Sequence, residues 1–154
     1  MKLISYRLNN NISYGVLVNN ELYSLPDINA SFPASMNAFL ALEETGMEMA
    51  RQTAQQIEAG TLTASPINNY EILAPVPHPT SCRDGYAFRQ HVEAARKNRG
   101  VEMIPEFDQY PIFYFTNHNA IFGGGELSLM PDHFRQLDFE LEVAIVIGKK
   151  GRNI

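Results

Sequence analysis

The chain is poor in the residues that build disulfide bonds, cysteine-rich metal sites and membrane spans. Its single cysteine, Cys82, excludes an intrachain disulfide and a zinc site built from several thiolates. No apolar run approaches the length of a transmembrane helix, and the N-terminal segment lacks the apolar core of a signal peptide. The sequence also lacks blocks of basic residues, internal repeats and low-complexity segments. We therefore expect a soluble, cytoplasmic protein.

The overall composition is that of a folded domain. The 154 residues are 45% hydrophobic and 19% charged, which provides enough apolar surface for an ordinary core. The formal net charge of −5 disfavours binding to nucleic acid or to an anionic membrane surface. The composition predicts one domain, with room for a small appended module, and neither nucleic acid nor a membrane as partner.

The first part of the chain, residues 1–68, predicts a small module of strands and helices. Residues 2–8, 14–18 and 21–25 have the pattern of three short strands. The Asn-rich segments between them suit tight turns, because Asn tolerates a positive φ.

Helices follow these strands. Ser35 is suited to cap a helix over residues 36–44 that Gly46 would end, and a second, polar helix over residues 47–59 would be closed by Gly60. The segment TLTASPINN then indicates a boundary, so we expect a second domain over residues 69–154.

The second region mixes helix and strand. The composition of residues 84–98 predicts a helix, with Phe88, Val92 and Ala95 spaced for one buried face. The segment PIFYF, residues 111–115, has high β propensity. The expected fold class is therefore α+β.

Three acids alternate with apolar residues in the segment LDFELEVAIVIG, residues 137–148. This alternation predicts a half-buried strand that continues into a strand buried on both faces. Residues two apart in a strand share a face, so Glu140 and Glu142 could converge on one Mg²⁺ or Ca²⁺. The alternative is a solvated outer face, and an E-x-E pattern by itself does not decide between the two.

Asp84 and His91 form a second candidate pair. They lie seven residues apart, two turns of a helix, so one helical face could carry both as a metal ligand and a general base. The alternative is a capping aspartate and a surface histidine. Another histidine, His133, lies in loop-like sequence and is expected to face solvent. The run Gly123–Gly125 lacks the Lys-Ser/Thr of a phosphate loop, and instead would let a loop approach another segment closely.

Together these motifs resemble the fumarylacetoacetate hydrolase family. The resemblance runs from about Leu73 to Ile154 and is most specific at LDFELEVAIVIGKKGRNI, where the family has a D-x-E-x-E strand followed by a V-I-G-x-x-G-R turn. The segments RDGYAFRQHVEAAR and PIFYFTNHNAIFGGGELSLMP are also similar. The spacing of Asp84, Tyr86 and His91 resembles the fumarylacetoacetase type more than the smaller acylpyruvase-like members.

The resemblance implies a metal-dependent hydrolase that cleaves a C–C bond in a β-diketone or acylpyruvate-type substrate such as fumarylacetoacetate, as in aromatic amino-acid catabolism. By position in the family's motifs, Asp84, Glu140 and Glu142 would hold one Mg²⁺ or Ca²⁺. His91 would be the base that activates water. Decarboxylation or hydration of a small 2-oxo acid on the same site is the alternative reaction.

The resemblance also implies a substrate pocket and a fold. Tyr86 and Tyr114 would line the pocket. No family role is carried over to Asp138, whose position next to the two glutamates fits support of the metal ligands. The family's substrate-binding arginine would fall near Arg99, with the spacing off by one residue. The implied fold is a mixed β-sandwich roll.

The family continues beyond the acid segment for a similar length again. The resemblance therefore implies the N-terminal half of a longer, homodimeric protein. Alone, such a half would be poorly active and prone to aggregate, or a non-catalytic fragment active only with the missing half.

Overall fold

The computed structural model describes residues 1–130 and 134–154, so His133 lies outside the described residues. The fold is α+β, and the chain divides into two compact units, residues 1–77 with 122–154 and residues 78–121. Within the described residues, no helix has the length and apolarity needed to cross a membrane. The division proposed at residue 68 stays a prediction.

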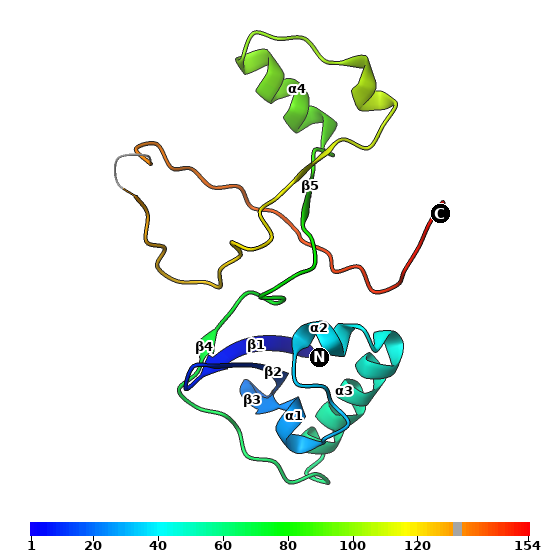
Figure 1. The fold of residues 1–154 in the computed structure, drawn as a ribbon, viewed down its shortest axis with the longest axis vertical. Coiled ribbons are helices and arrows are strands. Elements are labelled where there is room, and N and C mark those ends of the chain that lie inside the picture. Colours follow the sequence, from blue (N-terminus) through cyan, green and yellow to red (C-terminus); the bar gives the residue numbers. More distant parts are fainter. Residues whose placement is uncertain (131–133) are drawn as a thin grey trace. The chain divides into compact units, whose positions relative to one another are not determined.

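The first unit is built on a four-stranded antiparallel sheet with the order β3-β2-β1-β4 (Figure 1). Its strands are β1 (Lys2–Leu8), β2 (Asn11–Val18), β3 (Glu21–Ser24) and β4 (Glu71–Ile72). The loops between the first three strands are two-residue Asn-Asn turns in which every residue has a φ between 49° and 65°. Such turns need positive φ at both positions, which Asn accepts, so the predicted hairpins are confirmed.

Three helices follow in the same unit: α1 (Leu25–Ile28), α2 (Met36–Leu40) and α3 (Glu43–Glu58). The predicted cap is confirmed, since the Ser35 hydroxyl accepts a hydrogen bond from the Ala38 amide at 3.3 Å. The prediction that one helix spans residues 36–44 and ends at Gly46 is wrong. The helix is interrupted after Leu40 and resumes at Glu43, whose φ is +50°. Gly46 therefore lies inside α3.

The packing of Gly46 explains why it is inside a helix. A Cβ at this position would lie 2.9 Å from Leu42 Cβ and 3.1 Å from the Phe39 carbonyl oxygen. Glycine here therefore allows α3 to approach the end of α2, rather than ending a helix. Gly60, by contrast, has a φ of +68° just past the end of α3, as predicted for a helix terminator.

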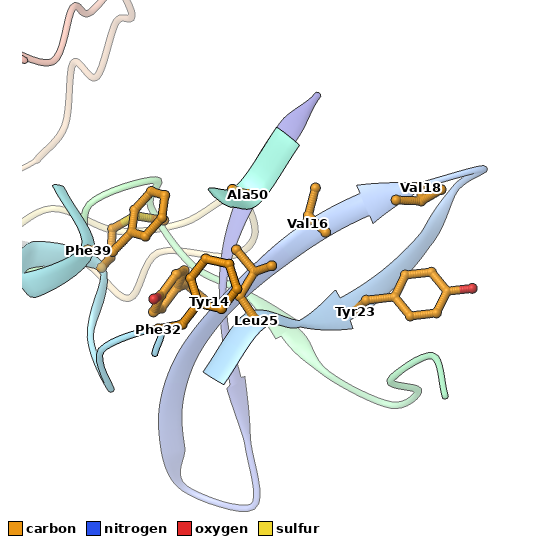
Figure 2. Close-up of a cluster of buried hydrophobic side chains, with 9 residues drawn as sticks. Tyr14, Val16, Val18, Tyr23, Leu25, Phe32, Phe39 and Ala50 are labelled. Atoms are coloured by element: carbon orange, nitrogen blue, oxygen red, sulfur yellow. The ribbon is translucent and has the colours of Figure 1, made fainter. Parts of the chain in front are cut away.

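The core of this unit lies between the sheet and the helices (Figure 2). Tyr14, Val16 and Val18 alternate along β2 and so share one face of the sheet. Phe39 of α2 packs on this face, with its ring centroid 5.1 Å from that of Tyr14. The Tyr14 hydroxyl is buried but donates a hydrogen bond to the Pro33 carbonyl oxygen at 2.9 Å. The alternation of β2 thus sets the side of the sheet on which the helices pack.

The second unit contains β5 (Arg83–Gly85), α4 (Arg89–Asn98), the 3₁₀ helix η1 (Pro105–Asp108) and β6 (Phe113–Phe115). The predicted strand in PIFYF is confirmed as β6. The helix expected from residue 84 begins only at Arg89, and Phe88, expected on its buried face, is 81% exposed. Val92, in contrast, is 1% exposed and is the buried anchor of α4.

The acid-bearing segment is not a strand in this structure. Residues 137–148 have no ladder partner within the described residues, and the side chains of Leu141 and Val143 are 95% and 93% exposed. The prediction of a half-buried strand leading into a fully buried one is therefore wrong here. High β propensity does not order a strand by itself, because strand stability depends on pairing and on a covered face.

The glycine run behaves as expected from the sequence. A Cβ on Gly123 would lie 2.4 Å from the Ile72 carbonyl oxygen and 2.9 Å from Leu73 Cα. The chain at residue 123 therefore passes against the backbone at the end of β4, which only a residue without a side chain allows.

Candidate functional site

Pairing of β5 with β6 brings two of the predicted site residues together. The two strands are antiparallel, and Asp84 is directly opposite Tyr114 in their register. Directly opposed residues in an antiparallel pair project to the same face of the ribbon. Asp84 is half-buried and Tyr114 is 60% exposed, so a carboxylate and a phenol share a face that solvent reaches.

Tyr86 follows β5 directly and is held by three contacts. Its amide donates a hydrogen bond to the Ile112 carbonyl oxygen at 3.0 Å, which extends the pairing beyond Gly85. Its ring meets the ring of Phe107 edge-on, at 6.2 Å between centroids and 81° between planes. Its hydroxyl accepts a hydrogen bond from Arg99 Nη2 at 3.3 Å. These contacts fix both ends of the Tyr86 side chain.

His91 lies in the first turn of α4 and is exposed. Asp84, by contrast, lies on a strand, so the expectation that one helical face carries both residues is wrong. Between them the chain turns at Tyr86, where the Ala87 amide donates a hydrogen bond to the Gly85 carbonyl oxygen at 2.8 Å, and Phe88 is extended just before the helix. Aspartate and histidine therefore come from two adjacent elements of the same unit.

Glu140 and Glu142 lie in the exposed segment that follows residue 134, in the other unit. Asp138 folds back locally, and its carboxylate accepts a hydrogen bond from the Phe139 amide at 2.8 Å. Within the part of the chain that the structure describes, no three His, Cys, Asp or Glu side chains are grouped so that they could hold a metal ion. Asp84 belongs to the unit of residues 78–121 and the two glutamates to the other unit, so binding of one metal ion by all three stays a prediction.

Arg99 is a contact of the site that spacing alone did not select. It caps the C-terminal end of α4, where its Nε donates to the Ala95 carbonyl oxygen at 3.1 Å while Nη2 reaches Tyr86. A basic residue at a helix C-terminus is favourable because it faces the exposed carbonyls of the last turn. That position, rather than the distance along the sequence, is the signal that could have identified it.

Comparison with known proteins identifies the region that carries this geometry. Residues 80–154 match the model of the fumarylacetoacetate hydrolase C-terminal domain. This range contains both strands of the ribbon, α4 and the acid-bearing segment.

Similar proteins come from several organisms. The chain is 27% identical to a fumarylacetoacetate hydrolase domain-containing protein 2 homolog of Dictyostelium discoideum, over 91% of this chain and 43% of that protein. It is 29% identical to the mitochondrial oxaloacetate tautomerase Fahd2a of Rattus norvegicus, over 80% of this chain and 36% of that protein. An uncharacterised protein of Staphylococcus epidermidis is 28% identical, over 100% of this chain and 53% of that protein.

The matched region thus spans about a third to a half of the length of these relatives. The family match covers the motifs that the sequence singled out, from the D-x-Y segment at Asp84 through the acids at 138–142. Residues 80–154 of the chain belong to the fumarylacetoacetate hydrolase family.

Proposed function

We propose that this chain forms part of an enzyme that acts on a small 2-oxo acid by moving a proton to or from its enol, with keto–enol tautomerisation of oxaloacetate as the reaction. The observation that carries the proposal is the ribbon face on which Asp84 stands opposite Tyr114, with Tyr86 directly after it. The relatives from rat, human and Xenopus laevis that are named oxaloacetate tautomerases support this choice of substrate.

The donor chemistry of the three predicted ligands suits a hard divalent cation. Asp84, Glu140 and Glu142 are carboxylates, and Mg²⁺ and Ca²⁺ prefer oxygen ligands of this kind. These residues would hold the ion. A bound dication supplies positive charge that stabilises the oxygen of an enolate. The two tyrosine hydroxyls would donate hydrogen bonds to the carboxylate and carbonyl oxygens of the substrate.

His91 is the proposed proton carrier. In the keto-to-enol direction its imidazole takes a proton from C3 of the substrate, and the same proton is returned to the oxygen on C2, so no atom is gained or lost. His91 is exposed in the first turn of α4. Histidine suits this role because it can accept and release a proton near neutral pH.

Hydrolysis of a C–C bond in a fumarylacetoacetate-like β-diketone is the second candidate. The spacing of Asp84, Tyr86 and His91, which is similar to the fumarylacetoacetase type, favours it. In that reaction His91 would take the proton of the attacking water rather than that of a carbon. Decarboxylation or hydration of a 2-oxo acid uses the same enol chemistry and belongs to the same substrate test.

For the fold and assembly, we propose that residues 137–148 form a strand of a mixed β-sandwich roll once they gain a pairing partner, in a homodimeric protein. The alternation of acidic and apolar residues supports this, because pairing would cover one face and leave Glu140 and Glu142 together on the other.

Titration calorimetry with Mg²⁺ and Ca²⁺ tests the metal proposal. We expect saturable binding by the chain that is lost in the Glu140→Gln, Glu142→Gln double variant. Glu126→Gln, which removes an exposed carboxylate from the same region, is the matched control and should bind as the wild type does. A folded dimer that binds neither ion would contradict the proposal.

A substrate panel tests the reaction. Oxaloacetate enol, acylpyruvates and fumarylacetoacetate are offered with and without Mg²⁺, and the loss of enol or diketone absorbance is followed. Metal-dependent loss of oxaloacetate enol that is abolished in His91→Gln supports the tautomerase. Turnover of only a diketone would refute it in favour of the hydrolase.

A further inference from the structure

Arg89, the first residue of α4, joins two elements of the second unit, α4 and η1. Its Nε lies 2.9 Å from Glu93 Oε1, one turn further along the same helix. Its Nη1 contacts the carboxylate of Asp108 at the end of η1. Its guanidinium carbon lies 5.7 Å from the centroid of the Phe107 ring. A single planar guanidinium thus binds two carboxylates from different elements and faces an aromatic ring.

The ring that Arg89 faces is the same ring that supports Tyr86. Phe107 meets Tyr86 edge-on, and the hydroxyl of Tyr86 is held by Arg99 at the far end of α4. The contacts therefore run from the first residue of α4 through η1 to Tyr86 and back to the cap of the same helix. His91 is two residues after Arg89, in the turn that this arrangement holds.

Stability does not explain the arrangement. The side chains of Arg89, Glu93 and Asp108 are 48%, 46% and 63% exposed, and ion pairs at such positions contribute little to folding because water screens them. The planar guanidinium of Arg89 contacts two carboxylates and a ring, so it fixes the orientation of the groups around it. A lysine ammonium on a flexible side chain would not.

We propose that Arg89 is a positioning residue, which clamps the first turn of α4 to η1 and thereby sets the orientation of Tyr86 and His91. The inference deepens the proposed function, because it takes these two side chains as the substrate contact and the proton carrier. Arg89 acts through Phe107 and through the helix backbone.

Nuclear magnetic resonance of the full chain, labelled with ¹³C in the tyrosine and histidine rings, tests the clamp without any substrate. The Tyr86 and His91 signals are assigned with Tyr86→Phe and His91→Gln. We expect both signals to shift in Arg89→Gln and in Asp108→Asn. The double variant should show no larger shift than either single variant, because both changes break the same contact.

Two further variants separate positioning from charge. Arg89→Lys keeps the charge but not the planar fork, so we expect it to leave the two signals displaced. Arg51→Gln is the matched control, since Arg51 also binds two glutamates on a helix and is 42% exposed. Restoration of the wild-type signals by lysine, or shifts no larger than those in Arg51→Gln, would overturn the proposal. Should Arg89→Gln fail to fold, Asp108→Asn decides in the same way.

An activity measurement adds a second readout. With oxaloacetate and Mg²⁺, we expect Arg89→Gln to lower kcat by about tenfold while KM changes less than about twofold, as for misplaced reacting groups. If the wild-type chain turns over no oxo acid, the proposed reaction fails, and the resonance shifts still decide whether Arg89 is a clamp. If Arg89→Gln keeps the wild-type Tyr86 and His91 signals and the wild-type turnover, the clamp is refuted and the proposed reaction is not affected.

Discussion

Substitution of Gly46 by alanine places helix propensity and packing in direct opposition. Gly46 lies within α3, where alanine is favoured over glycine by about 1 kcal/mol. The new methyl group would, however, lie 2.9 Å from Leu42 Cβ, 3.1 Å from the Phe39 carbonyl oxygen and 3.3 Å from Phe39 Cε2. The first two atoms belong to or adjoin the backbone, so they cannot rotate away.

The cost of packing the added methyl group should exceed the gain in helix propensity. Extra methyl groups in a well-packed core cost about 1–3 kcal/mol, and Phe39 is only 1% exposed. After the gain in propensity is subtracted, we expect Gly46→Ala to lower the free energy of unfolding by about 1 kcal/mol. Urea denaturation followed by circular dichroism measures this change. An unchanged slope of the unfolding free energy against urea concentration would show that the unfolded state is not altered.

Two controls make the result interpretable. Gln55 is an exposed position of α3. The difference in unfolding free energy between Gln55→Ala and Gln55→Gly therefore measures helix propensity without a clash. Phe39→Leu combined with Gly46→Ala should recover part of the loss from the clash, because a shorter side chain vacates the position of Cε2. The reasoning is refuted if Gly46→Ala stabilises the chain as much as alanine does relative to glycine at position 55.

Three further predictions concern the same unit. Glu43→Gly should stabilise the chain by about 0.5–1 kcal/mol, since glycine accepts the φ of +50° without a side-chain clash; a loss in urea denaturation would contradict this. Burial raises the pKa of the Tyr14 phenol from 10.0 to about 12, so this group's contribution to stability is complete below pH 10 and is lost as the pH rises through 12. Urea titrations from pH 8 to pH 12 should show a loss of about 2–3 kcal/mol that is absent in Tyr14→Phe and present in the control Tyr70→Phe. Leu141→Lys should reduce concentration-dependent light scattering by interrupting the exposed apolar segment, whereas Ser128→Lys should not; equal scattering by both would refute a role of residues 137–148 in self-association.

The elements predicted correctly from the sequence are those fixed by neighbouring residues. The Asn-Asn turns set the first three strands, because few residues accept positive φ at both turn positions. The Ser35 cap likewise depends on an amide three residues away. Such interactions leave a local pattern in the sequence, and the pattern was sufficient.

The errors arose where distant contacts override local preference. Gly46 looks like a helix terminator in sequence but is required by the approach of α3 to Phe39 and Leu42. Asp84 has helical composition around it, yet it pairs with β6, thirty residues further along the chain. Pairing of that kind depends on which segments meet in space, and composition does not record it.

The acid-bearing segment shows the same limit at the candidate site. Its alternation states which side chains would share a face, namely Glu140 with Glu142, but a face exists only when a neighbouring strand holds the backbone extended. The ribbon supplies such a neighbour for Asp84 and Tyr114, and residues 137–148 have none within the described residues. Asp84 and Tyr114 are therefore already held on one face of the ribbon. Glu140 and Glu142 need a strand partner before they share a face, so we expect the proposed metal binding and strand formation by these residues to be gained or lost together.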